Sequence, residues 1–190
     1  MVATDLQSKL KGVVVTSVTP FRDDKSVDLD AVERQASYLV DNGIKIVVPC
    51  GNTGEFTSLS TDESKQVTAA VARSVGDRAL VLAGVGWSLP NAIEQAQHAQ
   101  SVGAQAVIIH HPVHTYIHRE GLRAYYEGIL DAIDIGVVLY KRGPELTDSL
   151  ISELAQHERV VGVKYAVNDV SAFATLNENC LLYTSPSPRD

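Results

Sequence analysis

The sequence predicts an α/β fold in which parallel strands alternate with helices. Six short runs of mostly apolar and β-branched residues recur along the chain, at residues 12–19, 44–50, 79–85, 106–110, 136–140 and 160–165. Strands covered on both faces in a parallel sheet have this composition, whereas half-solvated antiparallel strands alternate apolar with polar residues. The strands start about 30 residues apart, which suits repeated units of one strand and one helix.

Five helices are predicted between these strands. Residues 28–42 carry apolar side chains at helical spacing, and Gly43 supplies the left-handed residue that ends the helix. Ser60 and Glu63 form a capping-box pattern at the start of a second helix, and Pro90 suits the first turn of a third helix that ends near Val102. Residues 121–133 and 147–156 complete the five.

Two architectures fit this alternation, an open doubly wound sheet and a closed (β/α)8 barrel. The open sheet is often marked by a phosphate-binding fingerprint, and this chain has none. The segment that begins at Gly51 lacks the Lys and Ser/Thr of a P-loop, and the Gly84-Val85-Gly86 segment lacks the third glycine of a dinucleotide loop. We therefore predict a TIM barrel that is incomplete, with about six strands and five helices present.

Length and composition separate the predicted barrel from a C-terminal tail. Eight units of about 30 residues need roughly 240 residues, whereas this chain has 190. Residues 1–176 are interpreted as the first three quarters of a barrel. Residues 177–190, which include Cys180 and place Pro186 and Pro188 among serines, are interpreted as a non-native or disordered tail.

Composition excludes several classes of protein. Sixteen Lys and Arg residues stand against 23 Asp and Glu residues, and the net charge of -7 argues against nucleic acid as a partner. Two cysteines, Cys50 and Cys180, are too few for a disulfide framework, and the polar N-terminus lacks the apolar core of a secretory signal. The apolar runs are far shorter than the roughly 20 residues that span a bilayer. We expect a cytoplasmic protein with no membrane partner.

A lysine and a tyrosine stand at the ends of two neighbouring predicted strands. Lys164 lies among apolar residues, and an amine in such a setting has a lowered pKa, which makes it a nucleophile for a carbonyl carbon. Tyr140 ends the preceding strand, where a phenol can relay protons. The alternatives are a lysine that pairs with a carboxylate or reaches solvent, and a tyrosine whose hydroxyl bonds to backbone.

The segment GNTGEF comes directly after the second predicted strand. Gly51 and Gly54 allow a tight turn that presents backbone N–H groups, as loops that hold a carboxylate or phosphate do, and Thr53 adds a hydroxyl. The alternative is a plain turn from strand to helix.

Taken in order, these motifs resemble the dihydrodipicolinate synthase and N-acetylneuraminate lyase family of class I aldolases. The similarity extends from about residue 10 to residue 176 and includes GNTGEF, the LY that ends the fifth strand and the GVK of the sixth. The resemblance implies a (β/α)8 barrel, a homotetramer for the full-length protein, a small-molecule 2-keto acid as substrate and no cofactor.

The same resemblance implies a mechanism and the residues that carry it. Lys164 would form an imine with the 2-keto carbon of a pyruvate-type acid, and Tyr140 would relay the proton. Asn52 and Thr53, with Gly54 beside them, would bind the carboxylate. The implied function is a Schiff-base-forming lyase, either a dehydratase or an aldolase.

Departures from the family pattern bear on the branch within it. The lysine-biosynthetic synthases carry Pro-Tyr-Tyr after the fourth strand and an arginine beyond the strand-five tyrosine, where this chain has Pro112-Val113-His114 and Gly143-Pro144-Glu145. The runs GNTGEFTSL and LYKR are closer to 5-dehydro-4-deoxyglucarate dehydratase. Arg142 would then bind a distal carboxylate of the substrate, and the alternative is a solvent-exposed loop arginine.

Four histidines in the range 110–118 raise the question of a metal site. No acidic partner flanks them and the family uses no metal for its chemistry, so we predict no metal. His114 is expected to contact a hydroxyl of the substrate instead.

Three alternatives to the lyase stay open. The first is a 4-hydroxy-tetrahydrodipicolinate synthase. The second is an inactive truncated barrel, and the third is a small-molecule sensor on an open sheet.

Overall fold

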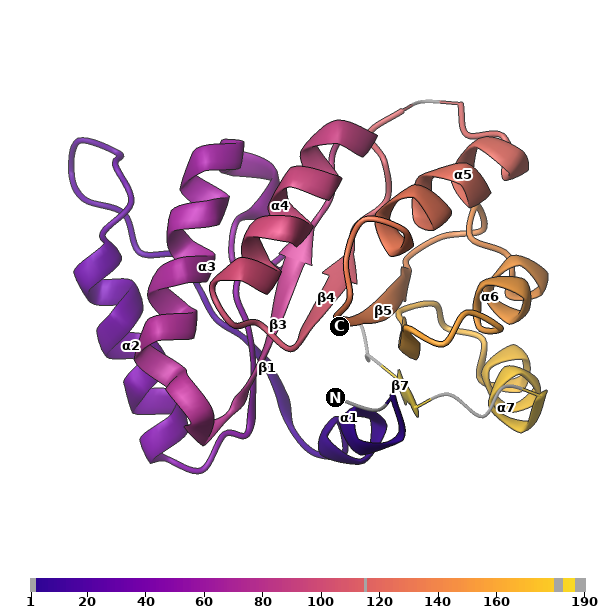
Figure 1. Cartoon of the computed structure of the whole chain (residues 1–190), viewed down its shortest axis with the longest axis horizontal. Helices are drawn as coiled ribbons and strands as arrows, with labels where there is room; N and C mark the ends of the chain where they lie inside the picture. Colours follow the sequence, from indigo (N-terminus) through magenta and orange to yellow (C-terminus); the bar gives the residue numbers. More distant parts are fainter. Residues whose placement is uncertain (1–2, 115, 180–182, 187–190) are drawn as a thin grey trace.

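The computed structural model describes residues 3–114, 116–179 and 183–186, and in them one curved sheet runs through the molecule (Figure 1). All of its neighbouring strands pair in parallel, and their order in the sheet is their order in the chain. The strands are β1 (Val14–Thr16), β2 (Ile46–Val48), β3 (Leu80–Val85), β4 (Ala106–Ile109), β5 (Gly136–Lys141), β6 (Val160–Tyr165) and β7 (Tyr183–Pro186). The six predicted strands are confirmed as part of a (β/α)8 barrel.

Helices connect consecutive strands and, apart from the N-terminal helix, cover the outside of the sheet (Figure 1). They are α1 (Ala3–Lys9), α2 (Leu29–Asp41), α3 (Thr61–Val75), α4 (Leu89–Ser101), α5 (Arg119–Leu130), α6 (Asp148–Leu154) and α7 (Val170–Asn179), with short 3-10 turns η1 (Phe56–Ser58) and η2 (Gly76–Arg78). The five predicted helices are confirmed as α2 to α6. Helices α1 and α7 were not predicted from the sequence.

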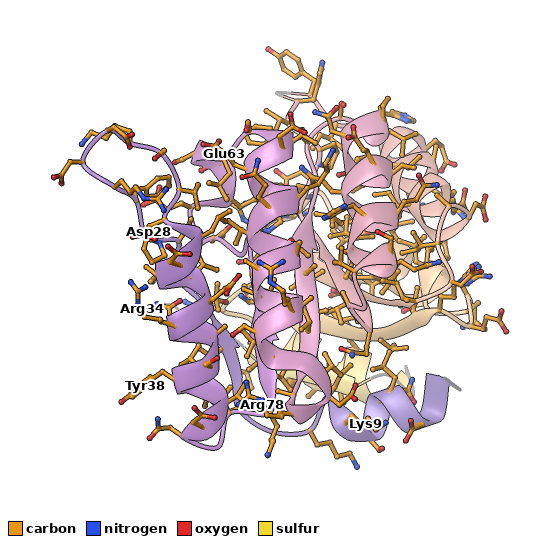
Figure 2. All side chains as sticks on the ribbon, turned by 60° about the vertical axis from the view of Figure 1, so that its left-hand side comes forward. Lys9, Asp28, Arg34, Tyr38, Glu63 and Arg78 are labelled. Atoms are coloured by element: carbon orange, nitrogen blue, oxygen red, sulfur yellow. The ribbon has the colours of Figure 1, made fainter. Side chains whose placement is uncertain are left out.

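Side-chain caps fix where the outer helices begin. Asp28 accepts a hydrogen bond from the backbone of Ala31 at the start of α2, and Ser60 with Glu63 completes the predicted capping box of α3. Figure 2 shows Asp28 and Glu63 at the same end of the molecule and Arg78 at the opposite end. The helix N-termini therefore lie at the end of the sheet where the parallel strands finish, which is the face where barrels of this class place their active sites.

The buried apolar side chains form two clusters, one on each face of the sheet. The outer cluster lies between strands and helices and includes Val47, Val81 and Ile109. The inner cluster lies on the barrel side and includes Ile46, Ile108 and Tyr140. Alternate residues of one strand thus enter different clusters, because successive side chains of a strand point to opposite faces.

Helix α1 covers the inner cluster rather than the outside of the sheet. Leu6 and Leu10 of this segment are buried against strand residues of the inner cluster. Gly136, at the start of β5, makes room for this contact, since a Cβ there would collide with the side chain of Leu6. Its hydrophobic contacts explain why a polar segment of the chain forms a helix.

Several predicted boundaries change in the structure. Strand β1 is shorter than the predicted residues 12–19, because it pairs with β2 alone among the described strands and leaves Val13 and Val18 exposed. Within the predicted tail, α7 extends to Asn179 and residues 183–186 pair with β6. Proline is tolerated in an edge strand, where its missing N–H costs no ladder hydrogen bond.

Cys180 and Pro188 lie outside the described residues, and the division of the chain at residue 176 stays a prediction. Among the described residues, every helix is too short or too polar to cross a lipid bilayer.

Candidate active site

Strands β5 and β6 bring the predicted lysine and tyrosine together. The strand register pairs Tyr140 with Lys164, so the two side chains leave the sheet on the same face. The Lys164 ammonium nitrogen lies 4.6 Å from the centroid of the Tyr140 ring. Tyr140 is buried and Lys164 half-buried at the end of β6. The site therefore places an amine beside a phenol on the inner face, at the end where the strands finish.

The turn after β2 adds a third predicted residue to this pair. The side-chain amide of Asn52 donates a hydrogen bond of 3.2 Å to the Tyr140 hydroxyl oxygen. We refer to Asn52, Tyr140 and Lys164 as the relay cluster. Because the amide donates to the phenol oxygen, the phenol's own hydrogen stays available for transfer to another acceptor.

The GNTGEF turn is held tightly against the end of β1. A Cβ on Gly51 would collide with the side chain of Thr16, and one on Gly54 would lie 2.7 Å from the backbone oxygen of Ser17. The Thr19 hydroxyl donates a 2.7 Å hydrogen bond to the Gly54 carbonyl. The close approach of a second backbone therefore requires glycine at Gly54, and the Thr16 side chain requires it at Gly51.

Some backbone N–H groups of this turn donate hydrogen bonds within the turn, and others do not. Gly54 and Phe56 donate to the Gly51 carbonyl, and Glu55 donates to the Asn52 carbonyl. None of the backbone hydrogen bonds described for the turn uses the N–H of Asn52 or Thr53. Gly54 was predicted to bind substrate, but its N–H already donates to the Gly51 carbonyl. A direct contact between Gly54 and the substrate stays a prediction.

The structure places Arg142 beside the relay cluster and gives His114 a different setting. The Arg142 guanidinium carbon lies 5.8 Å from the centroid of the Tyr140 ring. The hydrogen bonds described for His114 stay within its own loop, where its ring nitrogen accepts from the Tyr116 N–H at 3.0 Å. His114 also lines a cavity of about 290 Å³ between this loop and α5.

His110 is a neighbour of the relay cluster for which the sequence suggested no role beyond a possible metal site. Its ring stacks on Phe56 at a centroid distance of 3.9 Å and meets the Tyr140 ring edge-on at 5.7 Å. Burial lowers the pKa of His110 to about 4, so the imidazole is neutral at pH 7. The signal in the sequence is the pair of glycines Gly84, on β3, and Gly86, just after it, which leave space for a large ring.

A second unpredicted group lies behind the relay cluster on the outer face. Lys141 forms a 2.5 Å ion pair with Asp148, and the Tyr165 hydroxyl donates to the same carboxylate at 3.3 Å. Burial, reinforced by Asp148, raises the pKa of Tyr165 to about 12. These three side chains connect β5, β6 and the start of α6 directly behind Tyr140 and Lys164. The sequence does not indicate this group, because Asp148 lies at the start of α6 and only the fold brings its carboxylate to Lys141 and Tyr165.

Comparison with known proteins identifies the family. The model of the dihydrodipicolinate synthetase family matches residues 9–184. A 4-hydroxy-tetrahydrodipicolinate synthase from Pelobacter propionicus is 35% identical over 175 residues, which are 90% of this chain and 60% of that protein. The chain therefore spans about 60% of the length of this curated relative.

Solved structures agree with the sequence match. The dihydrodipicolinate synthase from Bacillus clausii has a TM-score of 0.88 and 39% identity, and the match covers 92% of this chain and 60% of that one. A prophage protein of the dihydrodipicolinic acid synthase family from E. coli K12, solved in complex with pyruvate, has a TM-score of 0.83 and 25% identity, with coverage of 90% and 59%. The chain belongs to the dihydrodipicolinate synthetase family.

Proposed function

We propose that this chain carries the imine-forming site of a Schiff-base lyase that acts on a pyruvate-type 2-keto acid or keto sugar acid. The observation that carries the proposal is the pairing of Lys164 with Tyr140, 4.6 Å from nitrogen to ring centroid, at the end where the strands finish. A relative of the same family has been solved with pyruvate bound.

The proposed chemistry begins with attack of the neutral Lys164 amine on the keto carbon of the substrate. The carbinolamine then loses water to give an imine, and loss of a proton from the adjacent carbon gives an enamine. Tyr140 accepts and returns protons in these steps, because its hydroxyl hydrogen is not used by Asn52. In an aldolase the protonated imine accepts the electron pair of the broken carbon–carbon bond and becomes the enamine, whereas in a dehydratase the enamine formed by proton loss expels a hydroxyl group from the next carbon.

Substrate binding is assigned to the groups around the relay cluster. The N–H groups of Asn52 and Thr53 and the Thr53 hydroxyl bind the substrate carboxylate in this proposal, and the Gly54 backbone shapes the turn that presents them. Arg142, beside Tyr140, binds a distal carboxylate, since a guanidinium matches carboxylate geometry with two hydrogen bonds. His114 contacts a substrate hydroxyl.

A second candidate is the 4-hydroxy-tetrahydrodipicolinate synthase reaction, which the names of the curated relatives favour. It shares the imine with the lyase reaction, but its enamine attacks a second substrate and forms a carbon–carbon bond. The lyase is favoured instead because this chain has Gly143-Pro144-Glu145 where the synthases carry an arginine. A keto sugar diacid separates the two, since a dehydratase releases carbon dioxide from it.

We also propose that the whole protein works as a cytoplasmic homotetramer. The alternative is an inactive truncated barrel.

Exchange of the pyruvate methyl protons with D₂O tests the proposed site, because the enamine forms only after the imine. Proton NMR should show loss of the methyl signal in the presence of the chain, and Lys164→Arg should abolish this loss. Tyr140→Phe should slow the exchange by about 100-fold, the usual scale for removal of a positioned acid or base. Lys45→Arg, on a lysine before β2, is the matched control and should exchange at the parent rate. Exchange that persists in Lys164→Arg would refute the proposal.

A further inference from the structure

Three contacts hold the His110 side chain against the relay cluster and its supports. One face of the ring stacks on Phe56 with an angle of 9° between the planes. The ring meets Tyr140 at an angle of 70°. The Nε2 atom lies 3.1 Å from the Cys50 carbonyl oxygen, and since a carbonyl only accepts, Nε2 carries the hydrogen.

The backbone around His110 is built to admit its ring. A Cβ on Gly86 would lie 2.9 Å from the His110 Cβ and 3.0 Å from the Phe56 ring. A Cβ on Gly84 would collide with the Cys50 carbonyl and lie 3.1 Å from the His110 Nε2. Gly84 and Gly86 therefore leave the space in which the His110 ring reaches the Cys50 carbonyl.

The partner of Nε2 connects His110 to the turn that carries Asn52. Cys50 immediately precedes this turn and has a left-handed backbone, with φ of 56°. A non-glycine residue in this region carries strain, which surrounding contacts must hold. The hydrogen bond from His110 fixes the Cys50 carbonyl two residues before Asn52.

We propose that His110 is a positioning residue for the proton relay. Its ring supports the Tyr140 phenol from the side, and its Nε2–H fixes the Cys50 carbonyl so that the Asn52 amide stays on the Tyr140 hydroxyl. Both partners of the 3.2 Å hydrogen bond between Asn52 and Tyr140 thus depend on one imidazole. This inference rests on the proposed function of the relay cluster.

The charges around His110 keep the imidazole in the form that this role needs. Burial is the largest cause that lowers the pKa of His110, and the positive charges of Arg142 and Lys164 lower it further. The hydrogen bond to the Cys50 carbonyl raises this pKa, but by less than burial lowers it. The Nδ1 atom is buried and has no hydrogen-bond partner among the residues that the structure describes. A neutral ring with one donor, at Nε2, satisfies the Cys50 carbonyl without adding a positive charge next to Lys164.

A double-mutant cycle on the exchange of pyruvate methyl protons tests this role. His110→Phe keeps an aromatic ring and loses the donor, whereas His110→Gln keeps a donor and loses the ring. We expect exchange about 10-fold slower for His110→Phe and about threefold slower for His110→Gln, with the half-saturating pyruvate concentration within about twofold of the parent value.

The decisive comparison is made in the Tyr140→Phe background. If His110 acts through Tyr140, adding either His110 variant to Tyr140→Phe should slow exchange by less than about twofold, because coupled residues are not additive. Independent effects that multiply, or a His110→Phe rate within twofold of the parent, would overturn the inference. Two His110 variants are used so that either one that folds decides the result.

His98 provides a matched control in the outer layer. Its ring nitrogen also lies near a backbone carbonyl, that of Lys65 at 3.0 Å, but on α4 outside the sheet. His98→Phe should exchange at the parent rate, and circular dichroism confirms that each variant is folded. If the parent chain shows no exchange, the proposed function fails and this inference fails with it. If the parent exchanges and the cycle is additive, only the role of His110 fails.

Discussion

Burial sets the protonation state of the side chains that surround the relay cluster. The Cys50 thiol is fully buried, and burial raises its pKa to about 12, so it stays protonated and unreactive in the folded chain. His110 is neutral because burial lowers its pKa to about 4. The ring nitrogens of His111 are buried as well, and burial lowers the pKa of this residue in the same direction.

Stability should therefore fall as the pH decreases from 6.5 toward 4. In this window the unfolded chain binds protons at His110, with an ordinary pKa of 6.5, while the folded chain does not. The expected loss between pH 7 and pH 5 is about 2 kcal/mol from His110 alone. Urea unfolding at the two pH values measures it. His110→Phe should lose correspondingly less over the same interval, and equal losses in the two proteins would contradict the assignment.

Strand periodicity and strand order predict that Lys164 and Tyr140 end neighbouring strands, and the register confirms this placement, while their catalytic roles stay predictions. The sequence does not predict the hydrogen bond between Asn52 and Tyr140, which joins residues 88 positions apart. The sequence also does not predict that His110 faces Tyr140. The position of a histidine ring at a strand end depends on the space beside it, which here is left by Gly84 and Gly86.

Helix starts are the elements that the sequence defines most sharply. Ser60 accepts a 3.2 Å hydrogen bond from the Glu63 backbone, and the Glu63 carboxylate accepts one of 2.9 Å from the Ser60 backbone, as the capping-box pattern predicts. Helix α1 was not predicted, because its sequence has no capping motif or helical pattern of apolar residues that was recognised. Leu6 and Leu10 are buried only because this segment packs against the inner face of the sheet.

Removal of the α3 cap should lower the stability of the chain. Ser60→Ala deletes the acceptor for the Glu63 N–H and should cost about 1 kcal/mol in the free energy of unfolding. Chemical denaturation measures the difference. Ser101→Ala, at the other end of a helix, loses a hydroxyl bonded to the His98 carbonyl and should change stability by less than about 0.5 kcal/mol. Equal effects of the two variants would show that the cap contributes nothing specific.

For the whole molecule, the order of the strands decides the position of the site. Because all strands are parallel and neighbours in the sheet are neighbours in the chain, the turns after β2, β4, β5 and β6 meet at one end. The alternation of apolar runs predicts this arrangement. Sequence patterns do not predict the pairing of residues 183–186 with β6, since a short serine- and proline-rich segment lacks strand periodicity.

The alternation of side chains along a strand explains why two lysines on adjacent strands lie in different surroundings. Lys141 and Lys164 both lie where β5 and β6 end, but they point to opposite faces. Lys141 is held by Asp148 behind the sheet, whereas Lys164 lies beside Tyr140 on the inner face. A keto acid that enters the barrel mouth should meet only Lys164.

Reductive trapping with pyruvate distinguishes Lys164 from every other lysine of the chain. The chain is incubated with pyruvate and sodium borohydride, digested, and mapped by mass spectrometry. We predict one pyruvate-derived adduct on the peptide that contains Lys164, none on Lys141, and none anywhere in Lys164→Arg. An adduct on Lys141 or on another lysine, or its absence from Lys164 in the folded chain, would show that Lys164 is not the imine-forming residue.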